Sequence, residues 1–178
     1  MNKNPSDIFK EMEKIAPVIN CTIGIFTNIG EAHVGRFGSL ENIVKTKSEI
    51  YQLTTNAKAV VNADEPYASQ WLQQLKGREV IRFGFENNAL EVYASEVVLK
   101  SQGSEFNLHI GKNIFACKLA TSGKHQVMNA LCAAAVAHGL NVSGEHIVTG
   151  LGAYQNTAGR GRELATLWGS KIIDDCYN

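Results

Sequence analysis

Short apolar runs alternate with amphipathic segments through the first half of the chain. Apolar runs rich in branched residues predict three buried strands, at residues 22–27, 58–63 and 79–84. Between them apolar positions recur at helical spacing, which predicts helices that begin after Ser39 and at Asp64, and a further helix from Asn4. Strands that alternate with helices are typical of a parallel sheet covered by helices.

The pattern changes over residues 90–120, where apolar and polar positions alternate. Three such stretches, separated by glycine-containing turns, predict an antiparallel β meander, at residues 90–99, 105–110 and 113–120. An alanine-rich helix is expected after Gly123, then a short helix near 145–151 and a final strand at 171–175. The predicted fold class is therefore α/β, a mainly parallel sheet flanked by helices with an antiparallel meander.

Composition narrows the classes of partner. Lys plus Arg equals Asp plus Glu, at 17 each, so no charge excess points to nucleic acid or an anionic membrane surface. The four cysteines have neither disulfide-framework nor metal-ligand spacing, and we expect them to be small buried residues. No signal-peptide pattern and no apolar run near the ~20 residues of a membrane span occur, so we expect a soluble, cytoplasmic protein.

Two candidate sites follow from position alone. Asn28 to His33 come directly after the first predicted strand, at the edge where open α/β sheets bind ligands. By itself His33 is either a hydrogen-bonded structural residue or a metal ligand, and Lys47 on the next helix is either a solvated charge or a functional one. The segment Gly123 to Leu131 is either a plain glycine turn and helix start or a ligand-binding helix N-terminus.

A third candidate lies near the carboxyl end of the chain. Arg160 and Arg162 flank Gly161, and two arginines in a glycine-rich turn suit bidentate phosphate contacts, although solvated surface charges are the commoner explanation of such a pair. The last strand then leads to Asp175.

Together these motifs resemble the central ATP-binding domain of the Mur ligase family. The string TNIGEAHVGRFGSLENIVKTKSEIY, residues 27–51, is similar to the branch that adds D-alanyl-D-alanine. GKHQVMNAL, residues 123–131, resembles the family's G-x-H-N-x-x-N-A-L box, with Gln126 where the first Asn is usual. A Gly-Arg pair followed fifteen residues later by Asp-Asp-Cys-Tyr-Asn resembles the family's third motif, with Cys176 in place of the commoner Ser.

The resemblance implies roles for these residues. His33 and a CO2-carbamylated Lys47 would hold Mg2+, since a carbamate offers the hard anionic oxygens that Mg2+ prefers; Lys45 is the neighbouring candidate for the modified lysine. Asn129 would contact the adenine of ATP. The remaining residues that the resemblance places at the nucleotide are Asn28 and His125, Arg160 near the phosphates, and Asp175 near the ribose.

The implied activity is ATP-dependent amide ligation in peptidoglycan biosynthesis, which adds D-alanyl-D-alanine to UDP-N-acetylmuramoyl-tripeptide through an acyl phosphate. We expect residues 1–178 to be a central domain of the P-loop type found in the family, without the UDP-sugar and carboxyl-terminal domains. We also expect this domain to be incomplete, because the sequence lacks the phosphate-binding G-x-x-G-K-[ST] loop. The isolated chain is then expected to bind ATP weakly at best and to be inactive. A folylpolyglutamate synthase-like ligase and a non-catalytic nucleotide-binding module are the alternatives.

Overall fold

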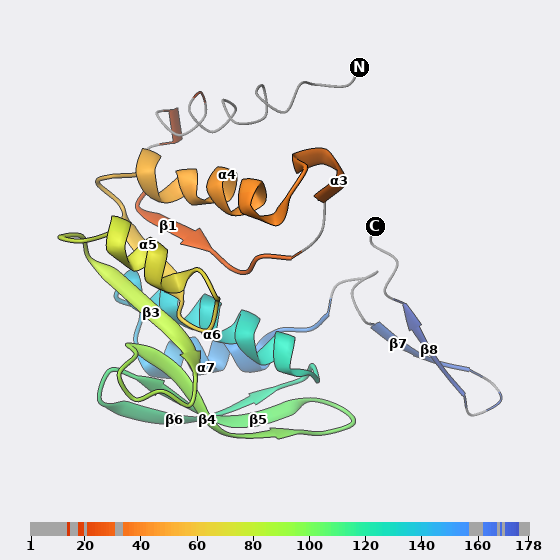
Figure 1. Cartoon of the computed structure of the whole chain (residues 1–178). Coiled ribbons are helices and arrows are strands. Elements are labelled where there is room, and N and C mark those ends of the chain that lie inside the picture. Colours follow the sequence, from red (N-terminus) through yellow and green to blue (C-terminus); the bar gives the residue numbers. More distant parts are fainter. Residues whose placement is uncertain are drawn as a thin grey trace.

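A single six-stranded sheet organises the part of the chain that the computed structural model describes, namely residues 14, 18–19, 21–30, 34–156, 162–166, 168 and 170–174 (Figure 1). Its strands, in spatial order, are β1 (Ile23–Phe26), β2 (Lys58–Asn62), β3 (Val80–Phe85), β4 (Val92–Leu99), β5 (Ser104–Ile110) and β6 (Asn113–Leu119). Neighbours from β1 to β4 are parallel, and β4 to β6 form the antiparallel meander. The predicted fold class is confirmed. The meander and the parallel part form one sheet, because β4 pairs in parallel with β3 and antiparallel with β5.

Helices cover both faces of this sheet. They are α3 (Val34–Phe37), α4 (Leu40–Leu53), α5 (Ala68–Gln74), α6 (Lys124–Gly139) and α7 (Gly144–Ala153). The α4 and α5 helices pack on one face, whereas α6 and α7 pack on the other. No described helix combines the length and the apolar composition that crossing a bilayer requires.

The residues of β2 show why its sequence is uniformly apolar. Val60 is fully buried in the cluster beneath α6, while Val61 is fully buried in the opposite cluster around Trp71 on α5. Successive side chains of a strand point to opposite faces, so a strand covered on both faces has no solvent-facing position left to be polar.

Side chains fix both ends of α4. The Ser39 hydroxyl accepts a hydrogen bond from the Asn42 backbone N–H at 3.2 Å and so caps the first turn. At the other end the Arg78 guanidinium donates to the carbonyls of Tyr51, Thr54 and Ala57, the last two at 2.6 Å. The Tyr51 and Thr54 carbonyls belong to the end of α4, where carbonyls lack intrahelical donors, and the Ala57 carbonyl directly precedes β2.

Two local expectations needed correction. The helix expected from Asp64 begins at Ala68, because the turn after β2 uses its polar side chains to hold neighbouring strands. The final strand, β8 (Lys171–Asp174), pairs with the unpredicted β7 (Arg162–Ala165) as a two-stranded antiparallel sheet. The helix expected from Asn4 falls largely outside the described residues. Of the cysteines expected to be buried, Cys117 and Cys132 are buried free thiols, whereas Cys21 is partly exposed. Cys176 lies outside the described residues.

Candidate functional site

The carboxyl ends of β1, β2 and β3 are joined by one polar turn. Asn62, the last residue of β2 and 3% exposed, donates from Nδ2 to the Thr27 carbonyl at 3.1 Å and accepts from the Asp64 N–H at 3.1 Å. Asp64 in turn accepts a 2.9 Å hydrogen bond from the Phe85 N–H at the end of β3. The turn therefore fixes the relative positions of all three strand ends.

Lys47 reaches this same edge from α4. Its Nζ lies 5.2 Å from the ring centroid of Phe26, the last residue of β1, within the range of a cation–π contact. Lys45, two residues earlier, instead lines a groove between α4 and α5. The structure thus brings Lys47 rather than Lys45 to the end of β1.

Glu65 is the acidic neighbour of Lys47. Burial raises the pKa of the Glu65 carboxyl above its usual value, and the charge of Asp64 adds to the rise; the Ile29 backbone N–H and the Lys47 ammonium act in the opposite direction. This carboxyl therefore lies within electrostatic reach of Lys47 and against the loop that follows β1. The sequence offers one signal for it, two carboxylates directly after a buried strand, but this pattern by itself predicts only the start of a helix.

The fit to a magnesium ion depends on the chemistry of Lys47. Among the described residues no group of three or more His, Cys, Asp or Glu side chains could hold a metal ion, and His33 lies outside these residues. As an ammonium, Lys47 would repel Mg2+; as a carbamate beside Glu65, it would give two anionic groups that a divalent cation can stabilise. Asn28 is in the exposed loop after β1, where its Oδ1 accepts from the Thr27 hydroxyl at 3.2 Å.

The amino-terminal end of α6 lies beside β3. Gly123 has a φ of +116°, and a Cβ there would lie 2.8 Å from His125 Cε1, so both the backbone and the packed imidazole favour glycine. The Lys124 Nζ lies 4.8 Å from the ring centroid of Phe85. His125 thus packs back against its own turn, and the positive end of the α6 dipole lies close to the carboxyl end of β3.

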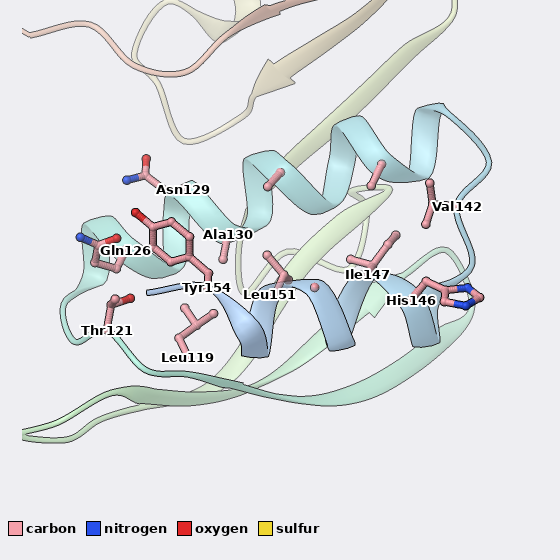
Figure 2. Close-up of a pocket in the computed structure, with 13 residues that line it drawn as sticks. Leu119, Thr121, Gln126, Asn129, Ala130, Val142, His146, Ile147, Leu151 and Tyr154 are labelled. Atoms are coloured by element: carbon pink, nitrogen blue, oxygen red, sulfur yellow. The ribbon is translucent and has the colours of Figure 1, made fainter. Parts of the chain in front are cut away.

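A cavity of about 500 Å³ follows the seam between α6 and α7, and Asn129 lines one end of it (Figure 2). Gln126 on the preceding turn of α6, Thr121 before the helix and Tyr154 at the end of α7 line the same end. Apolar residues dominate the remaining wall: Leu119, Ala130, Ala133, Ala137, Val142, Ile147 and Leu151. A mostly apolar cavity with a few convergent polar groups is the usual form of a small-molecule site.

The described residues place the candidates on the two faces of one sheet. Lys47 lies on the α4 side, and Asn129 lies on the α6 side, as does His125, which does not line the cavity. Arg160 and Asp175 lie outside the described residues. Sequence reasoning had missed Thr121 and Tyr154, since neither belongs to a motif.

Comparison with known proteins identifies the architecture. Residues 6–137 match the family model of the Mur ligase middle domain. The UDP-N-acetylmuramoyl-tripeptide–D-alanyl-D-alanine ligase of Mycobacterium tuberculosis is 36% identical over 167 residues, which cover 92% of this chain and 32% of that protein. The chain therefore spans about a third of the length of this relative.

Solved structures agree. A crystal structure of MurF from Acinetobacter baumannii matches with a TM-score of 0.86 at 30% identity, over 94% of this chain and 36% of that one. MurF ligase from Thermotoga maritima, solved in complex with ADP, shares the fold with a TM-score of 0.81 at 22% identity, over 95% of this chain and 38% of that one. The family match covers most of the chain, and the fold agrees with it: this chain belongs to the Mur ligase family, through its middle domain.

Proposed function

We propose that this chain forms the nucleotide-binding wall of an ATP-dependent ligase that joins D-alanyl-D-alanine to UDP-N-acetylmuramoyl-tripeptide. The observation that carries the proposal is Asn129, whose amide lines the polar end of the α6–α7 cavity within the segment that matches the family model. An amide can pair with N6 and N7 of adenine through two hydrogen bonds at once, a geometry suited to reading that base. The Mycobacterium tuberculosis relative carries this activity in its name.

In the proposed reaction the γ-phosphoryl group of ATP passes to the terminal carboxylate of the tripeptide, giving an acyl phosphate and ADP. The amine of D-alanyl-D-alanine then attacks the acyl carbon, and inorganic phosphate leaves. Asn129 binds the base, and Arg160 and Asp175 contact phosphate and ribose by resemblance. Carbamylated Lys47 and His33 would hold Mg2+, which when bound supplies neutralisation of the phosphoryl charge.

Only the binding half of this reaction is proposed for the chain by itself. The relatives that share this domain are about three times as long, and the named activity belongs to those complete proteins. We therefore expect weak Mg-ATP binding from the 178-residue chain and no ligase turnover.

Calorimetric titration of Mg-ATP into the 178-residue chain tests the proposal. Loss of a bidentate amide–adenine pair costs ~1–3 kcal/mol, so Asn129→Ala should raise the dissociation constant by about five- to 150-fold. Asn113→Ala, which removes an exposed amide from the far end of β6, is the matched control and should leave binding unchanged. A folded wild-type chain without saturable binding, or an Asn129→Ala variant that binds like wild type, contradicts the proposal.

A further inference from the structure

Tyr154 lies at one end of the α6–α7 cavity (Figure 2). It ends α7, with its N–H bonded to the Leu151 carbonyl at 3.2 Å and an extended backbone, φ −68° and ψ 136°. Its side chain is 46% exposed, yet it lines the cavity together with Gln126 and Asn129 (Figure 2). One part of a large aromatic ring therefore faces solvent beside two amides.

The cavity is chemically divided along its length. Two amides and the Thr121 hydroxyl gather at the Tyr154 end, whereas the opposite end, beside Val142, carries one polar ring, that of His146 (Figure 2). An aliphatic ligand would cover the half-buried Gln126 amide without giving it a hydrogen-bond partner, which is costly, and it would offer nothing to the exposed Asn129 amide. A flat heteroaromatic ring with donors and acceptors on its edges satisfies both the amides and an aromatic wall.

We propose that Tyr154 is a base-stacking residue, against whose ring the adenine of ATP lies while Asn129 and Gln126 pair with its polar edges. This assignment rests on the function proposed above and adds to it a residue outside the three sequence motifs. It also gives Gln126 a role: its amide, on a stem one methylene longer than that of the Asn usual in the family box, serves the same end of the cavity.

The decisive measurement is the dissociation constant of Mg-ATP for the 178-residue chain and three variants. Stacking of a base on an aromatic side chain is worth ~1–3 kcal/mol by alanine substitution, so Tyr154→Ala should weaken binding by about five- to 150-fold. Tyr154→Phe keeps the ring and should bind within about twofold of wild type. Tyr93→Ala removes a ring stacked on His109 in the meander, away from the cavity lining, and should leave binding unchanged.

A spectroscopic signature separates stacking from a structural role of Tyr154. In wild type, transferred nuclear Overhauser effects should connect the adenine H2 or H8 protons with tyrosine ring protons. In Tyr154→Phe these effects to tyrosine protons should disappear, because the Tyr154 signals are absent, while the affinity is retained. If Asn129→Ala weakens binding but Tyr154→Ala does not, the stacking role is refuted and the proposed function stands. If folded wild type binds no Mg-ATP, both are refuted.

Discussion

The turn after β2 allows a quantitative test of how the site is held together. Asn62 is almost completely buried and makes two side-chain hydrogen bonds of 3.1 Å, one to the Thr27 carbonyl and one from the Asp64 N–H. Asn62→Ala removes both bonds and leaves these two backbone groups without that partner. At ~1 kcal/mol for each bond, and more where a buried group stays unsatisfied, the free energy of unfolding should fall by ~2–3 kcal/mol.

Equilibrium urea unfolding, followed by circular dichroism and by the fluorescence of the fully buried Trp71, measures this loss. The melting temperature should fall by about 4–12 °C, since each kcal/mol corresponds to ~2–4 °C for a chain of this size. Amide hydrogen exchange should accelerate first at residues 27–30, because the lost bond to Thr27 holds the loop after β1.

A second variant, Asn62→Asp, adds a pH dependence of known sign. The carboxylate keeps the acceptor for the Asp64 N–H but faces the Thr27 carbonyl without a proton to donate, so the fold should raise the pKa of the introduced group. Its contribution to stability is then present below the unfolded pKa of ~3.9 and is lost as the pH rises through the folded pKa. The deficit relative to wild type should be larger at pH 7 than at pH 5.

The reasoning would be refuted by an Asn62→Ala variant that unfolds within ~0.5 kcal/mol of wild type, the range of an ordinary surface substitution. Exchange that accelerates evenly over the whole sheet would also contradict a local role. Asn113→Ala provides the control, since Asn113 is exposed at the start of β6.

Two further predictions concern the partly buried Arg78 and two buried cysteines, none of which lines the cavity. Arg78→Ala removes the donors to three carbonyls at and just beyond the end of α4, and urea unfolding should show a loss of ~3 kcal/mol that Lys76→Ala, at an exposed position, does not reproduce. Burial raises the pKa of Cys117 to about 11 and likewise that of Cys132, so their stabilising contribution should be present below pH 9 and be lost as the pH rises toward 11. Thiol labelling mapped by mass spectrometry should accordingly leave both unmodified at pH 8 in the folded chain and modify both in urea, and rapid labelling of either in the folded state would contradict their burial.

Periodicity predicted the elements well where the residues of an element follow one burial pattern, either alternating or buried throughout. The alternation in the meander is visible in β5, where buried Phe106 and Leu108 alternate with the half-exposed Asn107 and His109. The apolar run of β2 similarly indicated a strand covered on both faces. The strand β7, whose sequence RELA begins with two charged residues, has no apolar run like that of the equally short β1, and it therefore escaped prediction.

The polar turn at the site could not have been predicted in this way. Asn62 and Thr27 are 35 residues apart and meet only because β1 and β2 pair in parallel, with Phe26 opposite Val61. A shift of this register by one residue would turn the Asn62 side chain to the other face. Local pattern determines which residues form a strand, whereas the contact between two strand ends depends on the register of the assembled sheet.

The relative position of the two groups of candidate residues, one around Lys47 and one around Asn129, also depends on how the sheet is assembled. Lys47 approaches β1 from one face of the sheet and Asn129 lies on the helix that covers the other, so neither helix alone predicts the position of the other group. Parallel pairing from β1 to β3 places Phe26 and Phe85 at one edge, where the first contacts Lys47 and the second Lys124. A substitution that alters the ends of β1 to β3, such as Asn62→Ala, should therefore disturb the surroundings of Lys47 more than the α6–α7 cavity, because that cavity is built from the two helices, the end of β6 and the segment after it.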